Sequence, residues 1–267
     1  PGADSIAIEM VRDFFDYYML GAKNGYPLEP FVRYYQMGEN MWKTAESWES
    51  AASASDTFYL RPGGLLSREK PPAGEDGKEM IFYDPRDPSP SVGGARFDPF
   101  DADVPVGPQD IRETVESRDD ARIFSTPVLD EELVLLGTLK VKFYFSSNRT
   151  DTDIAVRLCD VYPDGRSIIL RQGIRRARFR ESFSAEKLMT PGGIYELEVE
   201  IDDMAQTFLP GHRLRIVVTS SNYPMFDVNT NTGGEMYVPG DTLTAENTIY
   251  FSLEYPSFLY FPTVSAT

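Results

Sequence analysis

The sequence of 267 residues is acidic, with 42 Asp and Glu against 26 Lys and Arg and a formal net charge of −16. Such a chain repels phosphate groups, which argues against nucleic acid and anionic membranes as partners. No apolar run approaches the roughly 18 residues of a membrane-spanning helix. The 41% of apolar residues suffice for a packed core and exclude a disordered chain. A single cysteine, Cys159, excludes an internal disulfide and leaves the redox compartment open.

The N-terminal segment predicts a helix over residues 5–20 that ends at Gly21. One face follows the helical period at Ile6, Met10, Phe14 and Tyr17. Further apolar side chains lie on the other faces, at Ile8, Val11, Phe15, Tyr18 and Met19. A helix that is apolar nearly all round requires packing partners on two sides. The sequence starts at Pro1 without the features of a signal peptide, so we expect the chain to begin inside a longer gene product.

Most of the remaining sequence predicts strands. Apolar and polar residues alternate with a period of two over 139–146, 195–201 and 213–218, as in strands with one face in a core. Further strands are expected over 31–36, 58–60, 81–83, 153–162, 167–180 and 247–255. Residues 61–110 are rich in Pro, Gly and Asp and predict a long connection. Many antiparallel strands with few helices predict an all-β fold, a jelly-roll β-sandwich.

Catalytic machinery is not apparent in the sequence. No Gly-x-Ser-x-Gly nucleophile elbow occurs, and the one histidine, His212, follows Gly211 at the start of a strand. A catalytic role of His212 is possible, but a structural role at the turn is favoured. Cys159 lies within a strand and is expected to be a buried apolar residue. With one His and one Cys we predict no zinc site, and no glycine pattern indicates a nucleotide cofactor.

Two groups of charged residues have alternative interpretations. Asp151 and Asp153 precede a strand, where they either contribute to a calcium site or form turn and capping bonds, which we favour. Arg176, Arg178 and Arg180 would share one strand face. They either form a polyanion-binding patch or, as we favour, an ion-paired sheet surface.

Several motifs, taken in order, resemble the CocE/NonD family of serine hydrolases, which includes X-Pro dipeptidyl-peptidases, cocaine esterases and α-amino acid ester hydrolases. A Tyr-Tyr-Gln-Met-Gly segment and a Tyr-Asp-Pro loop come first, and an Asp-Thr-Asp hairpin that ends in Pro-Asp-Gly follows. The matching segments are 34–42, 84–94, 151–165, 173–180, 211–215, 220–224 and 229–233. Together they extend over residues 31–261.

This resemblance is confined to the C-terminal, galactose-binding-like jelly roll of that family. It implies that residues 1–30 are the last helix and linker of a missing α/β-hydrolase domain, and that residues 31–267 are the jelly roll. The family's serine elbow and catalytic histidine would lie upstream of Pro1, and His212 matches a histidine outside the triad. The resemblance therefore implies a non-catalytic domain that braces the hydrolase domain and walls its substrate cleft. The missing domain would be its partner, and the apolar helix also permits self-association.

A loop over residues 220–233 is the candidate contact site. It carries asparagines whose side chains can bond to the backbone of the loop itself, together with two aromatic residues, which are not typical turn residues. We predict that it faces the missing domain near the cleft, through Asn222, Tyr223, Phe226, Asn229 and Asn231. The alternative is an autonomous carbohydrate-binding module in which aromatic side chains stack on sugars.

Overall fold

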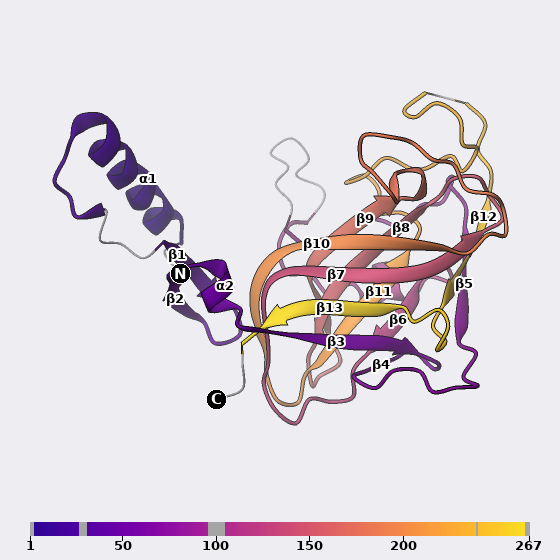
Figure 1. Cartoon of the computed structure of the whole chain (residues 1–267), viewed down its shortest axis with the longest axis horizontal. Helices are drawn as coiled ribbons and strands as arrows, with labels where there is room; N and C mark the ends of the chain where they lie inside the picture. The colour runs from indigo at the N-terminus through magenta and orange to yellow at the C-terminus, as the bar shows by residue number, and fades with distance from the viewer. Residues whose placement is uncertain (1–2, 27–30, 96–104, 239, 265–267) are drawn as a thin grey trace.

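A computed structural model describes residues 3–26, 31–95, 105–238 and 240–264 (Figure 1). Strands dominate it, and the predicted all-β class is confirmed; the designation as a jelly roll stays a prediction. The N-terminal helix α1 (Ala3–Leu20) projects from the β-structure, as Figure 1 shows. The short helices are α2 (Trp48–Ala51), η2 (Arg112–Glu116) and η3 (Ala177–Phe179). None of the helices in the described ranges is long and apolar enough to cross a membrane.

The larger sheet folds over into two layers. In the first layer the strands are β10 (Tyr195–Phe208), β7 (Leu133–Ser147), β12 (Ala245–Tyr250), β5 (Lys78–Tyr83), β13 (Phe258–Thr263) and β3 (Ala54–Arg61). The second layer contains β6 (Arg122–Ser125), β11 (Arg213–Thr219), β8 (Asp153–Val161) and β9 (Ser167–Arg176). The short strand β4 (Leu65–Ser67) pairs with β3 and β6 and so joins the layers. Figure 1 shows β7 and β10 lying in front of β8, β9 and β11.

The core lies between these layers. The inward residues predicted from alternation are fully buried on β7, at Leu139, Val141, Phe143 and Phe145. On the facing layer β8 is buried along its whole length, because side chains on both of its faces are covered. Gly173 of β9 lies against the backbone of β10, where a Cβ atom would stand 2.1 Å from the Glu200 carbonyl oxygen. The absence of a side chain there lets the edges of the two layers approach.

Several predicted boundaries were wrong. The strand predicted over 167–180 ends at Arg176, and η3 follows it. The strand predicted over 247–255 spans Ala245–Tyr250. The sequence analysis did not predict β6, β13 or the strand β2 (Met41–Ala45). These strands are short or lack regular alternation, so tertiary pairing rather than pattern determines them.

A small hairpin connects α1 to the sandwich. The strands β1 (Val32–Gln36) and β2 pair antiparallel. The hairpin is tied to β10 by a bridge between Met37 and Gln206 and by a 3.0 Å bond from Gln36 Nε2 to Thr207 Oγ1. It therefore lies at the end of the sandwich where β10 finishes, which we call the hairpin end. The helix α1 is beside the same end (Figure 1).

Exposed apolar side chains cover much of α1. Phe15 is 50% exposed and Met19 73% exposed, and Ile8, Val11, Phe14 and Tyr18 are exposed as well. Its aromatic residues contact one another and Tyr26, which follows the helix; the Phe14 and Tyr26 ring centroids are 5.5 Å apart. The apolar faces of this helix are therefore largely exposed, without a packing partner for them among the described residues.

Candidate functional site

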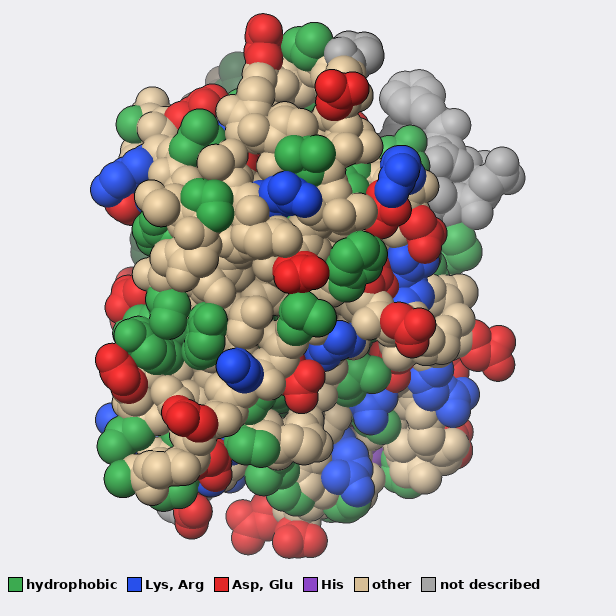
Figure 2. All heavy atoms as spheres, turned by 90° about the vertical axis from the view of Figure 1, so that its right-hand side faces the viewer, with side chains coloured by type: hydrophobic (Ala, Val, Ile, Leu, Met, Phe, Trp, Pro, Cys, Tyr) green, Lys and Arg blue, Asp and Glu red, His purple; other side chains and the backbone are tan. Residues whose placement is uncertain are grey.

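The candidate contact loop lies at the opposite end of the sandwich from α1. Strand register establishes this, because Asp153 at the start of β8 pairs with Arg176 at the end of β9. Thr219 at the end of β11 pairs with Ala155 of β8. The connections 84–92, 117–121, 148–152, 177–194 and 220–238 therefore leave one end, which we call the loop end. Figure 2 shows this side of the molecule, where hydrophobic side chains lie among charged ones of both signs.

The three candidate asparagines are buried and bonded internally. Asn222 Nδ2 donates to Gln172 Oε1 at 3.0 Å, and its Oδ1 accepts from Ser91 Oγ at 2.8 Å. Asn229 Oδ1 accepts the backbone N–H of Asn231 at 2.9 Å. Asn231 has a φ of 60°, in the left-handed region that asparagine tolerates. The hydrogen bonds of these buried side chains fix the conformation of the loop. The asparagines can therefore affect a domain contact only by positioning the exposed residues of the loop.

The two candidate aromatics reach the surface. Tyr223 is 46% exposed, and Phe226 is half-buried. Tyr223 is held by its backbone, because its N–H donates to the Ser89 carbonyl at 3.0 Å and its carbonyl accepts from Ser91 N–H at 2.6 Å. Their predicted contact with a hydrolase domain stays a prediction.

Phe226 forms part of the wall of a cavity of about 150 Å³. Its other apolar walls are Ile174, Phe179 and Met236. Tyr237 is at the rim, 75% exposed and with a φ of 61°, a strained conformation for an aromatic residue. Sequence analysis did not single out Met236 or Tyr237, since nothing in the pattern brings their loop to Phe226. The size of the cavity suits one apolar side chain of a partner.

One ion pair lines this cavity, and a second, buried pair is linked to it through Asn229. Asp153 pairs with Arg176 at 2.9 Å, and Asp151 pairs with Arg178 at 2.7 Å. Asn229 Nδ2 bridges both carboxylates, at 3.0 Å from Asp151 Oδ2 and 2.8 Å from Asp153 Oδ1. Burial raises the pKa of Asp153, and its bonds to Arg176 and Asn229 oppose this rise.

The structure corrects both favoured interpretations of these charged residues. Asp151 and Asp153 are members of buried ion pairs rather than simple turn caps. Arg178 and Arg180 lie in or after η3 instead of on a strand face, and Arg178 is only 4% exposed. The arginines are ion-paired as expected, but in the interior of the loop end. A continuous strand was assumed for residues 167–180, and that assumption led to the error.

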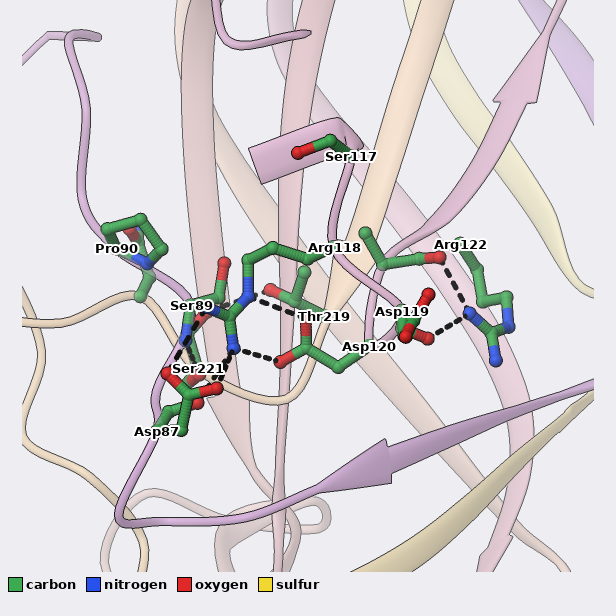
Figure 3. A network of polar contacts seen from close by, with 12 residues as sticks. Asp87, Ser89, Pro90, Ser117, Arg118, Asp119, Asp120, Arg122, Thr219 and Ser221 are labelled. Carbon is green, nitrogen blue, oxygen red and sulfur yellow. Dashed lines mark hydrogen bonds and ion pairs between the residues drawn. The ribbon is translucent and has the colours of Figure 1, made fainter. Parts of the chain in front are cut away.

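A second, more open hollow of about 460 Å³ lies between β5 and the loop that precedes β6. It is lined by one aromatic side chain, Phe82, and by polar residues that include Asp84, Asp87, Arg118 and Asp120. Arg118 bonds to Asp120 at 2.7 Å and to Asp87 at 3.2 Å, as Figure 3 shows. These bonds tie the loop after β5 to the loop before β6.

The structure gives His212 a structural setting. His212 is 8% exposed, and its Nδ1 lies 2.8 Å from Asp160 Oδ1. Its ring packs on Tyr162 with centroids 4.5 Å apart. Among the described residues no Ser, Thr or Cys side chain is bonded to the imidazole, so no nucleophile–base pair is present there. Cys159 is buried as predicted, and burial raises the pKa of its thiol. Within the same residues, no three His, Cys, Asp or Glu side chains are grouped to hold a metal ion.

Fold and site together define the class of protein: an all-β domain without a serine-hydrolase triad in its described residues. The profile of the X-Pro dipeptidyl-peptidase C-terminal non-catalytic domain matches residues 24–260. The chain belongs to this family.

The chain is similar over nearly its whole length to parts of larger enzymes. It is 36% identical to the cocaine esterase of Rhodococcus sp. strain MB1 Bresler over 270 residues, which cover 97% of this chain and 46% of the esterase. An aminopeptidase structure from a Thaumarchaeota archaeon matches with a TM-score of 0.83 and 28% identity, over 96% of this chain and 43% of that one. An α-amino acid ester hydrolase structure matches with a TM-score of 0.79 and 32% identity, over 95% and 44% respectively. The chain thus spans less than half the length of these relatives.

Proposed function

We propose that this chain is the non-catalytic domain of a serine hydrolase and that it braces an α/β-hydrolase domain and walls one side of its substrate cleft. In this proposal residues 1–30 belong with the hydrolase domain and residues 31–267 form the β-domain. The single observation that carries it is the exposed apolar surface of α1 in a chain that aligns with less than half of each relative. An exposed apolar patch of this kind marks an interaction surface.

The proposed hydrolase domain supplies the chemistry. Its serine attacks an ester or amide carbonyl while a histidine accepts the serine proton. The histidine then gives this proton to the leaving alcohol or amine as the ester or amide bond breaks, and water hydrolyses the resulting acyl-enzyme. The similar proteins carry names of ester- and peptide-cleaving enzymes, which supports a carbonyl substrate of this type. X-Pro peptides, α-amino acid esters and acyl amides are the candidate substrates.

The positions of α1 and the loop end constrain the proposed arrangement. They lie at opposite ends of the sandwich (Figure 1). A hydrolase domain that packs on α1 and also meets Tyr223 therefore extends along the length of the sandwich. Its cleft would be bordered at the loop end by Tyr223, Phe226 and the 150 Å³ cavity.

The carbohydrate-binding alternative has less support. Sugar recognition combines an exposed aromatic platform with free polar groups beside it. At the 150 Å³ cavity the Asp153 carboxylate and the Arg176 guanidinium bond to each other, and Asn229 also bonds to Asp153. A glycan-binding screen with the chain separates the two proposals, since the hydrolase proposal predicts no bound glycan.

The experiment that tests the proposal begins with the coding sequence upstream of Pro1. We expect a Gly-x-Ser-x-Gly elbow there and hydrolysis of p-nitrophenyl esters or X-Pro-anilides by the full-length protein. Replacing the elbow serine with alanine should abolish turnover, whereas the 267-residue chain should show none. An upstream sequence without an elbow would contradict the proposal.

A further inference from the structure

Arg157 is a fully buried arginine in the middle of β8, on a strand whose other side chains are also buried. Its guanidinium bonds only to neutral acceptors among the described residues. Nη1 donates to Thr219 Oγ1 at 2.9 Å. Nη2 lies within bonding distance of the Pro90 carbonyl at 3.0 Å, Asn222 Oδ1 at 2.9 Å, Ser89 Oγ at 3.2 Å and the Ser221 carbonyl at 3.5 Å. Nε has no hydrogen-bond partner within the part of the chain that the structure describes.

A charge in this position opposes folding. Burial lowers the pKa of Arg157 to about 10. The nearby carboxylates of Asp120 and Asp87 bond to Arg118 instead, as Figure 3 shows beside Ser89, Thr219 and Ser221. A buried charge is costly unless it is paired and hydrogen-bonded, and among the described residues only hydrogen bonds to neutral acceptors offset that cost for Arg157. The function of this arginine is therefore to be sought in the groups it holds.

Those groups belong to two loops that position Tyr223. Ser89 and Pro90 are in the loop after β5, whereas Ser221 and Asn222 follow β11. Next to the guanidinium the same loops are joined by the two backbone bonds of Tyr223, to the Ser89 carbonyl and from the Ser91 N–H. A planar guanidinium presents five donors in a fixed geometry, so one side chain can hold both loops at once.

We propose that Arg157 is a positioning residue that holds the 89–91 and 219–223 segments together and so sets the surface position of Tyr223. The loop-clamping role is a property of this chain alone. Its consequence for docking rests on the proposed function, in which Tyr223 meets the hydrolase domain.

The clamp is tested by amide hydrogen exchange on the 267-residue chain and its Arg157→Met variant. We expect the Ser91 and Tyr223 amides to exchange at least about tenfold faster in the variant. In the wild-type chain the loops can open only when the guanidinium hydrogen bonds break, and in the variant these bonds are absent. The amides of Val156, beside Arg157 in β8, and of Ile216 in the neighbouring strand β11 should keep their protection. The matched control is Arg166→Met, which removes an exposed arginine from the hairpin end and should leave both loop amides unchanged.

Unchanged exchange at Ser91 and Tyr223 would overturn the proposal, as would an equal acceleration at Val156 and Ile216. A second variant, Arg157→Lys, keeps the charge but has a single ammonium group in place of the planar guanidinium. Loop protection should be lost in this variant too, which keeps the test decisive if Arg157→Met does not fold. Full protection of the Ser91 and Tyr223 amides in Arg157→Lys would show that the planar guanidinium is not required to hold the two loops.

The docking consequence is measured separately, by steady-state kinetics of the full-length protein that carries each variant. Faster loop exchange with a raised KM supports both proposals. Faster loop exchange with an unchanged KM leaves the clamp established and overturns the contact role of Tyr223.

Discussion

His212 Nδ1 lies 2.8 Å from Asp160 Oδ1 and the pair is buried at the hairpin end, where β8 ends and β11 begins. The geometry resembles the histidine–carboxylate half of a catalytic triad, but no nucleophile completes it among the described residues. Burial raises the pKa of Asp160, and the bond to His212 opposes this rise. The pair joins two strand ends.

We predict that the 267-residue chain hydrolyses p-nitrophenyl esters and X-Pro-anilides no faster than buffer. His212→Ala should leave that background rate unchanged and lower the unfolding midpoint, because it deprives the buried Asp160 of its partner. Both are measured on one preparation, by absorbance and by thermal unfolding. Turnover that survives purification and disappears in His212→Ala would show that the pair is catalytic.

Tyr223→Ala and Phe226→Ala should raise KM or weaken domain docking in a full-length hydrolase while the 267-residue chain stays folded. Both side chains lie at least partly at the surface of the loop end, and interface aromatics contribute strongly to binding. Steady-state kinetics and thermal unfolding are the measurements. Tyr260→Ala, an exposed aromatic on β13, is the matched control. Kinetics and stability like those of the parent in both loop variants would mean that the loop is ordinary surface.

The double variant Phe15→Ser with Met19→Ser should reduce self-association of the chain without changing the unfolding midpoint of the sandwich. These side chains are one helical turn apart and exposed, so they support contact between molecules rather than the core. Sedimentation velocity over a concentration series measures the association. Glu9→Gln on the same helix is the control. A wild-type chain that stays monomeric throughout would contradict self-association through α1.

Gly173→Ala should destabilise the chain by about 3 kcal/mol or more, since overpacking forces backbone shifts at a buried site. The new Cβ would meet the Glu200 carbonyl oxygen at 2.1 Å, where β9 and β10 close the sandwich. Gly234→Ala is the control, because its nearest neighbour is the Thr232 hydroxyl at 3.3 Å. Urea unfolding measures both. Equal midpoints for the two variants would show that the layers are not closely packed at Gly173.

The lowered pKa of Asp110 predicts that the stability of the chain depends on pH. Its bonds to Arg112 lower its pKa from 3.8 to about 2. The folded pKa lies below the unfolded one, so the stabilisation is present above pH 3.8 and is lost as the pH falls through about 2. Because the side chain is 29% exposed, we expect Asp110→Asn to cost only about 1 kcal/mol at pH 7.

The cost of Asp110→Asn should disappear near pH 2, as measured by urea unfolding across the pH range. The control is Asp164→Asn, an exposed pair with Arg166, which should change stability less. A cost that is independent of pH would show that the Asp110 charge does not contribute.

The sequence by itself determined the strands with regular alternation, the N-terminal helix and the family. Alternation at Leu139, Val141, Phe143 and Phe145 predicted the buried face of β7, because a strand with one covered face must alternate. The motif order predicted the relationship to CocE/NonD hydrolases that the comparisons confirm.

The tertiary structure alone decided how the polar residues of the loop end are used. Arg157, Arg178 and the three loop asparagines are polar residues that the sequence places near turns or alternating strands, where exposure is the ordinary expectation. Their burial results from loops that are distant in sequence, such as 84–92 and 220–233, meeting at one end of the sandwich. Buried polar groups must find partners, and only the fold brings Ser89, Thr219 and Asn222 to one guanidinium.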